Sequence, residues 1–368
     1  MTTTETRRPM AELAAVGQSV WLDYIRRDLF DGDLGDLVAA GLRGMTSNPT
    51  IFEQAIAGTD LYDEDIAAFL ADRPDADPVA VFEHVAIADI RAAADTLRPV
   101  YDESGGRDGF VCLEVSPELA RDTAGTVADA RRLWAAVDRP NLMIKVPGTP
   151  EGLPAITELI GAGINVNVTL LFSMAHYDAV VDAWLAGLEA CDDPSAVHSV
   201  ASVFVSRIDG AVDMALTEIG TEEAQALRGR VAVANSKAIY ERFRGRLGED
   251  FEAEWGRGVA PQRPLWASTS TKNPDYPDLL YVETLVADQT VNTMPPATLD
   301  AFVDHGEVRA DAATDDLDDA HEVLAALGDV GVDLAEVCDD LQDEGVDKFA
   351  ASFTSMLEAI EAKAGELR

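Results

Sequence analysis

The sequence predicts an α/β fold, a closed (βα)8 barrel of the TIM type that carries a C-terminal helical extension. Short runs rich in β-branched residues alternate with longer stretches of alanine, leucine and charged residues at helical spacing, which is the pattern of βαβ units around a parallel sheet. Eight such runs are present, the number that closes a barrel of this type. The chain of 368 residues is also longer than the roughly 250 residues of a minimal barrel. An open, doubly wound sheet has the same alternation and stays the alternative.

Three parts of the chain follow from this pattern. We expect residues 1–17 to form an N-terminal helical segment, residues 18–302 the barrel, and residues 303–368 the extension. The eight predicted strands are QSVWLD (18–23), GMTSN (44–48), FVCLEVS (110–116), LMIKVPG (142–148), INVNVTLLF (164–172), ASVFVSR (201–207), PLWASTS (264–270) and DQTVNTMP (288–295). The predicted helices between them include residues 78–97, 117–137, 173–188, 208–219 and 231–247.

The extension begins where the composition changes after about Phe302. An acidic stretch, DAATDDLDDA (311–320), precedes two helical patterns that end near Lys363. These helices have apolar faces, which a free tail would not need, and we therefore expect them to pack on the barrel. The apolar residues are Val332, Leu334, Val337, Leu341, Val346, Phe349 and Phe353.

The formal net charge of −39 argues against two classes of partner. Nucleic acids and anionic membrane surfaces are bound through clustered basic faces, and such acidity repels both. Neither is expected as a partner. Any site for an anionic substrate must therefore concentrate a few cations in a local pocket, because charges are screened over about 8 Å at physiological salt.

The N-terminal sequence and the cysteines point to a cytoplasmic protein. The first ten residues, MTTTETRRPM, lack the apolar core of a signal peptide, and no apolar run approaches the roughly 18 residues of a membrane span. The three cysteines are scattered, and no histidine or cysteine cluster has zinc spacing. We expect no metal and no cofactor.

The fifth predicted strand carries polar residues where a barrel interior is normally apolar. Side chains alternate inward and outward along a barrel strand, so that Asn165, Asn167 and Thr169 share one face of INVNVTLLF. Buried amide and hydroxyl groups need hydrogen-bond partners, which either the protein or a ligand can supply. Catalytic groups in such barrels lie at the carboxyl ends of the strands.

Two carboxylates end apolar strands. Glu114 in FVCLEV must be paired, protonated or engaged with a substrate, and pairing with a lysine is the structural alternative. Asp23 ends QSVWLD in the same way, although an acidic residue there can equally cap the next helix.

Lys145 is the most informative residue. Only five lysines are present among 28 basic residues, so a lysine within the apolar run LMIKVPG requires a reason. A lysine amine can become the neutral nucleophile that condenses with a ketone, whereas arginine stays protonated. The alternative is a structural ion pair with Glu114.

Two further cations follow strands near several hydroxyl groups. Arg207 follows ASVFVS, and Lys272 lies in ASTSTKNP with Ser268 and its neighbours. Hydroxyls, backbone N–H groups and cations together are typical of a phosphate site. Strict alternation from Phe204 would turn Arg207 outward, so its inward orientation requires the strand to end or bulge there.

The order of motifs along nearly the whole chain resembles the transaldolase family in its longer bacterial form. The motifs are WLDYIRRDLF, GMTSNPTIF, EVSP, MIKVPGT, NVNVTLLFS, SVFVSRID, WASTSTKNP and VNTMPPATL. The resemblance implies a class I aldolase barrel with its Schiff-base lysine on the fourth strand, and Lys145 lies in the fourth predicted strand. It also implies transfer of a dihydroxyacetone unit from sedoheptulose 7-phosphate or fructose 6-phosphate to glyceraldehyde 3-phosphate or erythrose 4-phosphate, in the non-oxidative pentose phosphate pathway.

The resemblance further implies a role for each candidate residue. Glu114 would act on the Lys145 adduct through a water held by Thr169, and Asp23 would take the C4 hydroxyl proton. Substrate contacts are implied for Asn48, Asn167, Ser202, Phe204, Arg207, Ser268 and Lys272, of which Arg207, Ser268 and Lys272 would hold the phosphate. Shorter members of the family carry an arginine near STKN, so the identity of the second phosphate cation stays open.

Two other functions fit the same fold. A fructose 6-phosphate aldolase would release dihydroxyacetone instead of transferring it, and a catalytically inactive protein would only bind sugar phosphates. The longer chain and the pair of carboxylates favour transfer, and an intact nucleophile argues against a binding-only role. The sequence leaves open whether the protein is a monomer or a homodimer.

Overall fold

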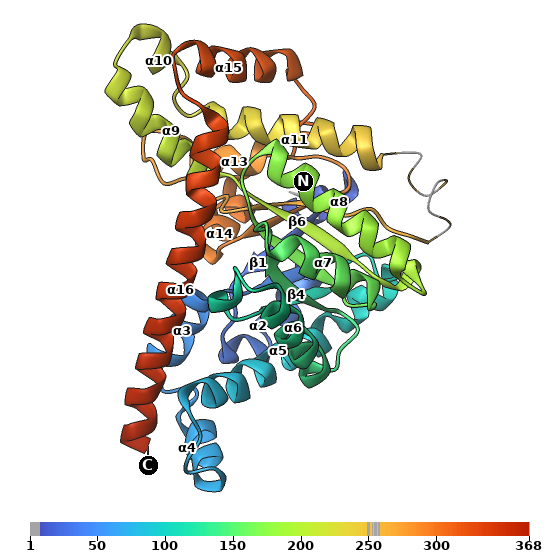
Figure 1. Ribbon diagram of the computed structural model, residues 1–368, viewed down its shortest axis with the longest axis vertical. Helices are drawn as coiled ribbons and strands as arrows, with labels where there is room; N and C mark the ends of the chain where they lie inside the picture. The colour runs from blue at the N-terminus through green and yellow to red at the C-terminus, as the bar shows by residue number, and fades with distance from the viewer. Residues whose placement is uncertain (1–7, 249–250, 252, 254–255, 257, 368) are drawn as a thin grey trace, which may run out of the picture.

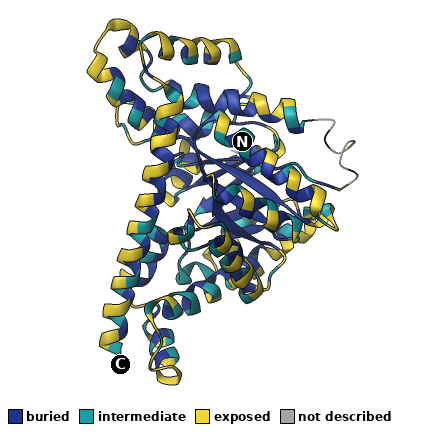
Figure 2. Ribbon diagram, viewed as in Figure 1, coloured by how far each residue is buried: buried dark blue, intermediate teal, exposed yellow. Residues whose placement is uncertain are grey.

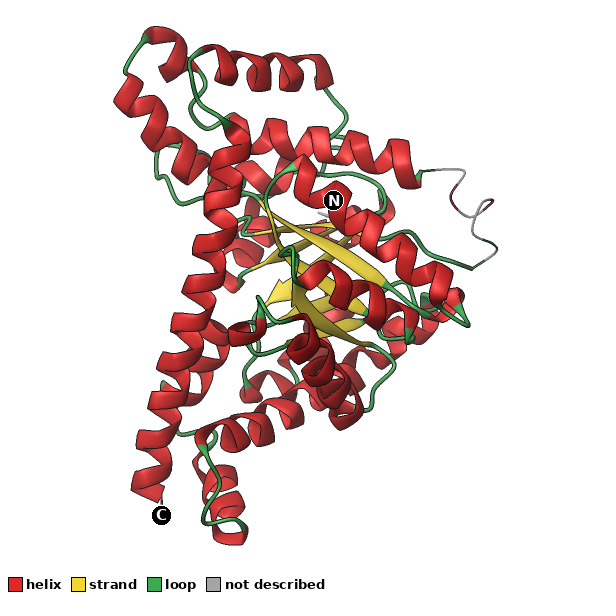
Figure 3. Cartoon of the chain, viewed as in Figure 1, coloured by secondary structure: helices red, strands yellow, loops and turns green. Residues whose placement is uncertain are grey.

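The predicted closed barrel is confirmed. The computed structural model describes residues 8–248, 251, 253, 256 and 258–367. Eight parallel strands pair in chain order, and the eighth closes on the first. Figure 3 shows the strands in yellow at the centre, with red helices around them. The strands are β1 (Gln18–Asp23), β2 (Gly44–Thr46), β3 (Phe110–Glu114), β4 (Leu142–Pro147), β5 (Val166–Leu171), β6 (Ser199–Phe204), β7 (Arg263–Ala267) and β8 (Thr290–Met294).

Each predicted strand contains or overlaps an observed one, and the differences lie at the ends. The predicted run GMTSN is shortened to Gly44–Thr46 because Asn48 caps the next helix, its Oδ1 accepting from the amide of Ile51 at 3.0 Å. In the sixth run, Arg207 is not in the strand. β6 ends at Phe204, and the following helix begins at Ser206.

Helices surround the strands. They are α1 (Pro9–Ala15), α2 (Asp33–Ala40), α3 (Pro49–Ala57), α4 (Asp63–Asp72), α5 (Pro78–Glu103), α6 (Thr123–Val137), α7 (Gly152–Gly161), α8 (Met174–Ala190), α9 (Ser206–Ile219), α10 (Glu222–Ala226), α11 (Val231–Leu247), α13 (Leu280–Glu283), α14 (Pro296–His305), α15 (Leu317–Asp329) and α16 (Leu334–Leu367). Short 3-10 turns are η1 (Arg27–Asp31), η2 (Pro117–Leu119) and η3 (Pro194–Ala196).

Two predicted helices differ from the observed ones. α5 continues past Pro99 to Glu103, because a proline removes only its own N–H from the helical hydrogen bonds. The helix predicted over 117–137 is divided into η2 and α6, since the Asp122 carboxylate accepts from the amide of Gly125 at 3.0 Å and thereby starts α6.

The barrel strands form the buried centre of the molecule, drawn in dark blue in Figure 2. Trp21 of β1 fills the interior near the start of β2, where a side chain on Gly44 would lie 2.5 Å from the Trp21 ring. The indole contacts Phe110 at 6.2 Å between ring centroids. The barrel interior near the starts of the strands is therefore filled with side chains and is not an open pore.

The C-terminal helices pack against the barrel domain, as their apolar faces predicted. α16 runs along one side of the barrel in Figure 1 and contacts α3, α5 and α9. α15 packs on α11. It begins at Leu317, inside the acidic stretch, because Asp318 and Asp319 lie in its first turn, where negative charge interacts favourably with the helix dipole. Residues 1–7 of the predicted N-terminal segment lie outside the described residues. No helix in the described part of the chain is both long and apolar enough to cross a membrane.

Candidate active site

A cavity of about 600 Å³ opens at the carboxyl ends of the strands. This is the end of a (βα)8 barrel where catalytic residues are found. Most of the predicted site residues line it, namely Asp23, Asn48, Lys145, Thr169, Ser202, Phe204, Arg207, Ser268 and Lys272. Glu114 and Asn167 are not among its lining residues and lie directly behind it, in contact with residues that are.

Lys145 lies on β4 in register with Glu114 of β3, and both side chains are almost fully buried. Lys145 Nζ donates to Glu114 Oε2 at 3.4 Å and to the carbonyl of Ser47 at 3.3 Å. Both contacts are long for charge-assisted hydrogen bonds, which are typically about 2.7 to 2.9 Å. The amine is thus held loosely and keeps one face toward the cavity.

Asp23 lies at the end of β1 and is oriented by two threonines. Thr46 donates to Asp23 Oδ1 at 2.7 Å, and the Thr46 and Thr293 hydroxyls are 2.7 Å apart. The motifs GMTSN and VNTMP contain these threonines, but a threonine inside a strand is too common to stand out in the sequence. Asp23 does not cap the next helix, so the alternative considered for it is wrong.

The two carboxylates have raised pKa values. Burial raises the pKa of Asp23, and the positive charge of Lys145, the Thr46 hydroxyl and Lys272 oppose this effect. Burial likewise raises the pKa of Glu114, Lys145 opposes the shift, and Asp23 adds to it. Two buried carboxylates with raised pKa values, close to one lysine amine, are suited to exchange protons with a substrate.

The polar face of β5 divides into a structural part and a part that faces the cavity. Asn165 donates to the carbonyls of Pro140 and Leu142 and accepts from the amide of His198, so the protein supplies its partners. Asn167 accepts from Ser202 at 2.7 Å. The alternative in which a ligand supplies the hydrogen-bond partners is therefore wrong for Asn165.

Thr169 is fully buried, and its hydroxyl has no hydrogen-bond partner among the described residues. The second carboxylate oxygen of Glu114, Oε1, has none there either. Buried polar atoms are normally hydrogen-bonded. Both atoms are therefore available to a water or a substrate hydroxyl.

Arg207 reaches the cavity because β6 ends before it, which fulfils the condition for its inward orientation. It lies in the first turn of α9, 5.1 Å from the ring of Phe204. Its Nη1 is buried without a hydrogen-bond partner among the described residues, and burial lowers the pKa of the guanidinium. An unpaired buried cation is suited to an anionic ligand.

The hydroxyl groups near Arg207 come from the loop that follows β7. Ser268 has a φ of +54° and lies 2.9 Å, hydroxyl to hydroxyl, from Ser206. Lys272 is exposed at the rim and donates to Ser270 at 2.7 Å. Arg207 and Lys272 thus border the same cavity, but Arg207 is half-buried and Lys272 is exposed.

Helix α16 contributes a residue that the site reasoning missed. Phe349 covers the cavity, with Lys145 Nζ 5.4 Å and Arg207 Cζ 6.0 Å from its ring centroid. The sequence placed Phe349 on an apolar face, and nothing in its spacing distinguishes a residue that covers a site from one that only packs.

The same helix contacts the irregular end of β5. Leu170 has a φ of +62°, which is rare for a branched side chain, and the register between β5 and β6 shifts between Val168 and Leu171. Gln342 of α16 donates to the carbonyls of Leu170 at 2.9 Å and Gly148 at 3.2 Å. α16 therefore holds the backbone next to Thr169.

The fold and the cavity together define a class, a (βα)8 barrel enzyme that presents a lysine amine between two carboxylates. Among the residues described, no group of three or more histidine, cysteine, aspartate or glutamate side chains is arranged to hold a metal ion. The nucleophile and the acid–base groups that line or adjoin this cavity are the side chains of Lys145, Asp23 and Glu114, a set suited to Schiff-base chemistry.

Comparison with known proteins identifies the family. The family model described as "Transaldolase/Fructose-6-phosphate aldolase" matches residues 20–360. The chain is 50% identical to a transaldolase of Frankia alni over 97% of this chain and 98% of that protein. It is 51% identical to transaldolase 1 of Streptomyces coelicolor, over 97% of this chain and 95% of that protein. It is also 51% identical to a transaldolase of Thermobifida fusca, over 96% of this chain and 97% of that protein. The chain belongs to the transaldolase/fructose-6-phosphate aldolase family, as the resemblance predicted, and groups there with transaldolases.

Proposed function

We propose that this enzyme transfers a dihydroxyacetone unit between sugar phosphates through a Schiff base on Lys145. The observation that carries the proposal is a buried lysine amine 3.4 Å from a buried carboxylate, open on one side to a cavity with Asp23 on its wall. The donor is sedoheptulose 7-phosphate or fructose 6-phosphate, and the acceptor is glyceraldehyde 3-phosphate or erythrose 4-phosphate.

The first half of the reaction forms the Schiff base. The ammonium of Lys145 first gives up a proton. Its neutral amine then adds to the C2 carbonyl of the ketose, and a proton passes from the nitrogen to the former carbonyl oxygen to give a carbinolamine. Loss of its hydroxyl as water requires a proton, which Glu114 delivers through a water held between Glu114 Oε1 and Thr169 Oγ1. The unsatisfied hydrogen-bonding capacity of both atoms supports this assignment.

The second half breaks and remakes the carbon–carbon bond. Asp23 takes the proton of the C4 hydroxyl while the C3–C4 bond breaks, the aldose phosphate leaves, and the electron pair is delocalised into the iminium as an enamine. The acceptor aldehyde then adds at C3, Asp23 returns the proton to the new hydroxyl, and water releases the product from Lys145. The hydrogen bond from Thr46 fixes the orientation of the Asp23 carboxylate.

We assign the substrate contacts by position on the cavity wall. Asn48 and Ser202 hold the hydroxyls of the three-carbon fragment, and Asn167 orients Ser202 by accepting a hydrogen bond from its hydroxyl. The phosphate group is bound by Arg207 with Ser268, and Lys272 at the rim is the second cation. Phe204 lines the pocket beside Arg207.

The wider assignments belong to the same proposal. The enzyme works in the non-oxidative pentose phosphate pathway in the cytoplasm, without a cofactor. Residues 18–302 form the catalytic domain, residues 1–17 precede it, and residues 303–368 form the extension that carries Phe349.

Two measurements test the proposal. Treatment with fructose 6-phosphate and borohydride should attach a three-carbon adduct to the peptide that contains Lys145, detectable by mass, and Lys145→Arg should lose the adduct and the activity together. Lys237→Arg is the matched control, because that lysine is partly buried elsewhere and bonds the carbonyl of Asp315. An adduct on another lysine, or an active Lys145→Arg enzyme, would overturn the mechanism.

A coupled assay separates transfer from simple aldol cleavage. With fructose 6-phosphate as donor, glyceraldehyde 3-phosphate should accumulate only when erythrose 4-phosphate is supplied. Accumulation of free dihydroxyacetone at the same rate without the acceptor would identify an aldolase instead. No turnover under either condition would leave a binding protein.

A further inference from the structure

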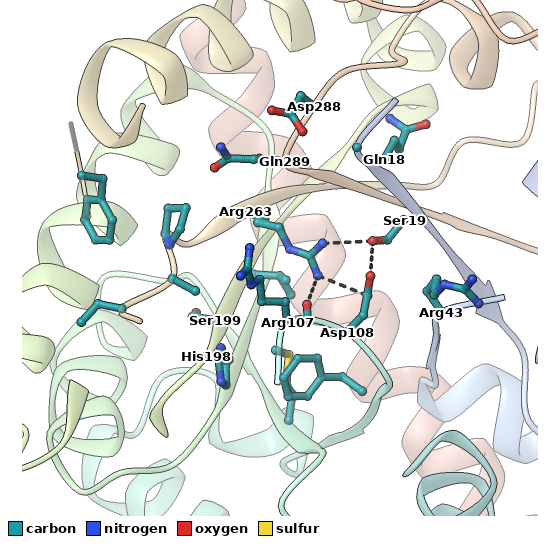
Figure 4. Close-up of a pocket in the computed structure, with 18 of the residues that line it drawn as sticks. Gln18, Ser19, Arg43, Arg107, Asp108, His198, Ser199, Arg263, Asp288 and Gln289 are labelled. Carbon is teal, nitrogen blue, oxygen red and sulfur yellow. Dashed lines mark hydrogen bonds and ion pairs between the residues drawn. The ribbon is translucent and has the colours of Figure 1, made fainter. Parts of the chain in front are cut away.

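A second cavity lies at the other mouth of the barrel, where the strands begin. Its volume is about 630 Å³, and Figure 4 shows the side chains around it. Ser19 near the start of β1, Phe110 at the start of β3, Ser199 at the start of β6 and Arg263 at the start of β7 all border it. The proposed reaction at the carboxyl ends of the strands does not use any of these residues.

One charged network in this cavity is complete within the protein. Asp108 accepts from Ser19 and from the indole of Trp21 at 3.0 Å, and it lies 3.3 Å from the Arg263 guanidinium. Arg263 also donates to Ser19 at 3.0 Å and to the carbonyl of Arg107 at 2.8 Å. The charges of Asp108 and Arg263 therefore compensate each other, and this network forms the floor of the cavity.

Two other arginines that border the cavity are not compensated. The side chain of Arg43 donates only to the carbonyl of the preceding Leu42, at 3.0 Å, within the described part of the chain. The guanidinium of Arg107 has no hydrogen bond or ion pair with any described residue. Other surface arginines, such as Arg121, Arg131 and Arg139, pair with a carboxylate, whereas these two border the same cavity without such a pair in the described part of the chain.

A buried histidine lies close to two of these arginines. The ring of His198 borders the cavity, packs 5.4 Å from the ring of Phe110, and is buried. Burial, together with the positive charges of Arg263 and Arg107, lowers its pKa to about 4. An anion bound beside these groups would offset this effect and raise the pKa of His198.

The remaining polar groups of the cavity differ in character. In the view of Figure 4, Asp288 and Gln289 lie on one side of Arg263, and Arg107, Asp108 and His198 lie on the other. The carboxylate of Asp288 and the amide of Gln289 can hydrogen-bond to hydroxyl groups. The negative charge of Asp288 would repel an anion placed against it. The cavity thus has a cationic part and a part suited to hydroxyls.

We propose that the amino-terminal mouth of the barrel binds a small phosphate monoester that carries hydroxyl groups. Its phosphate lies against Arg107, Arg43 adds positive charge from the other side of Asp108, and its hydroxyls lie toward Asp288 and Gln289 (Figure 4). Guanidinium groups bind phosphate oxygens through paired hydrogen bonds, which supports arginine in this role. The site is separate from the catalytic cavity and does not depend on the reaction proposed above.

The test removes the phosphate contact of the catalytic cavity first. In an Arg207→Met enzyme, glycerol 2-phosphate, which has no carbonyl to react with Lys145, should still bind at one site by calorimetry. Adding Arg107→Ser to this background should weaken that binding by about tenfold or more, the effect of losing one charge-assisted hydrogen bond. Arg43→Ser should weaken it less, because Arg43 acts on the phosphate only through its charge. Arg131→Ser is the matched control, since this half-exposed arginine pairs with Glu158 and does not border the cavity.

Two further readouts make the result specific. The imidazole signals of His198, assigned by comparison with His198→Gln among the five histidines, should shift when glycerol 2-phosphate is added. Arg107→Ser alone should leave the transfer activity unchanged, because Arg107 is at the other mouth of the barrel. Glycerol without phosphate should not bind.

Several outcomes would overturn the proposal. These are the absence of binding in the Arg207→Met enzyme, affinity unchanged by Arg107→Ser and Arg43→Ser, or a His198 signal that ignores the ligand. Inorganic phosphate should bind more weakly than glycerol 2-phosphate, and equal affinity would refute the hydroxyl contacts with Asp288 and Gln289.

Discussion

Replacement of Arg207 by methionine should have opposite effects on stability and on substrate binding. Arg207 is largely buried, one of its nitrogens has no partner among the described residues, and burial lowers its pKa. The protein therefore holds a cation in an environment that disfavours charge. Methionine preserves much of the packing against Phe204 and Phe349 and removes the charge.

The expected magnitude follows from two opposing terms. Burial of an unpaired charge costs several kcal/mol, less here because the residue keeps some access to the cavity. The contacts of the guanidinium with the rings of Phe204 and Phe349, at 5.1 and 6.0 Å, each stabilise the folded protein by about 0.5 to 2 kcal/mol. We expect Arg207→Met to raise the free energy of unfolding by about 1 to 2 kcal/mol.

Substrate binding should change in the other direction. Loss of one charge-assisted contact to the phosphate costs about 1.5 to 3 kcal/mol, which corresponds to an increase in KM for fructose 6-phosphate of about 10- to 150-fold. Unphosphorylated dihydroxyacetone should be affected little. Urea unfolding measured without substrate and steady-state kinetics on the same preparations give the two quantities.

Two results would refute this reasoning. If Arg207→Met is less stable than the parent enzyme, the guanidinium is a structural cation whose ring contacts outweigh its burial. If KM for fructose 6-phosphate does not change, Arg207 does not contact the phosphate. Arg121→Met is a suitable control, because this exposed arginine pairs with Asp343 outside the cavity and should leave both quantities nearly unchanged.

Three other perturbations probe separate parts of the molecule. Glu114→Gln should slow imine formation in single-turnover experiments by about 10² to 10⁴ and leave the fold intact; an unfolded variant would make Glu114 a structural partner instead. Gln342→Leu should lower the free energy of unfolding by about 2 to 4 kcal/mol, because the carbonyls of Gly148 and Leu170 lose their hydrogen-bond donor. It should also decrease kcat by a larger factor than it alters KM, and an unchanged kcat would contradict a positioning role. The pKa of His198 is lowered to about 4 from 6.5, so that as the pH falls the unfolded chain binds a proton before the folded protein does. The stability present above pH 6.5 should therefore decrease by about 3 kcal/mol as the pH falls toward 4. Urea titrations at several pH values should show this slope, and His198→Gln should flatten it.

The barrel and most of the cavity could be predicted because their signals are local. Each strand is a short apolar run with a fixed alternation, and a polar residue at its carboxyl end stands out against that run. Asp23, Glu114 and Lys145 were found in this way, and the observed register brings Glu114 beside Lys145. The carboxyl ends of all strands meet at one mouth of a barrel, so the proximity of these residues can be predicted without the positions of the helices.

The errors arose where long-range contacts decide the role of a residue. Asn165 and Thr169 share one face of the predicted fifth strand. Asn165 lies just before β5, where main-chain groups satisfy it, whereas Thr169 lies nearer the other end of β5 and faces the cavity. Alternation indicates the face of a strand and not the depth along it. Phe349 was read as a packing residue because its position over Lys145 depends on how a helix nearly 200 residues away in sequence docks on the barrel.

The docking of α16 connects the extension to the difference between transfer and release. An enamine on Lys145 that meets water or a proton before the acceptor releases dihydroxyacetone, so a transferase must keep this side of the cavity covered. α16 supplies that cover with Phe349, and through Gln342 it holds the irregular end of β5 next to Thr169. One helix therefore both limits access to the amine and positions the hydroxyl proposed to hold the catalytic water. Loss of this helix would therefore remove both of these contacts, while Lys145, Glu114 and Asp23 lie on strands of the barrel and do not belong to it.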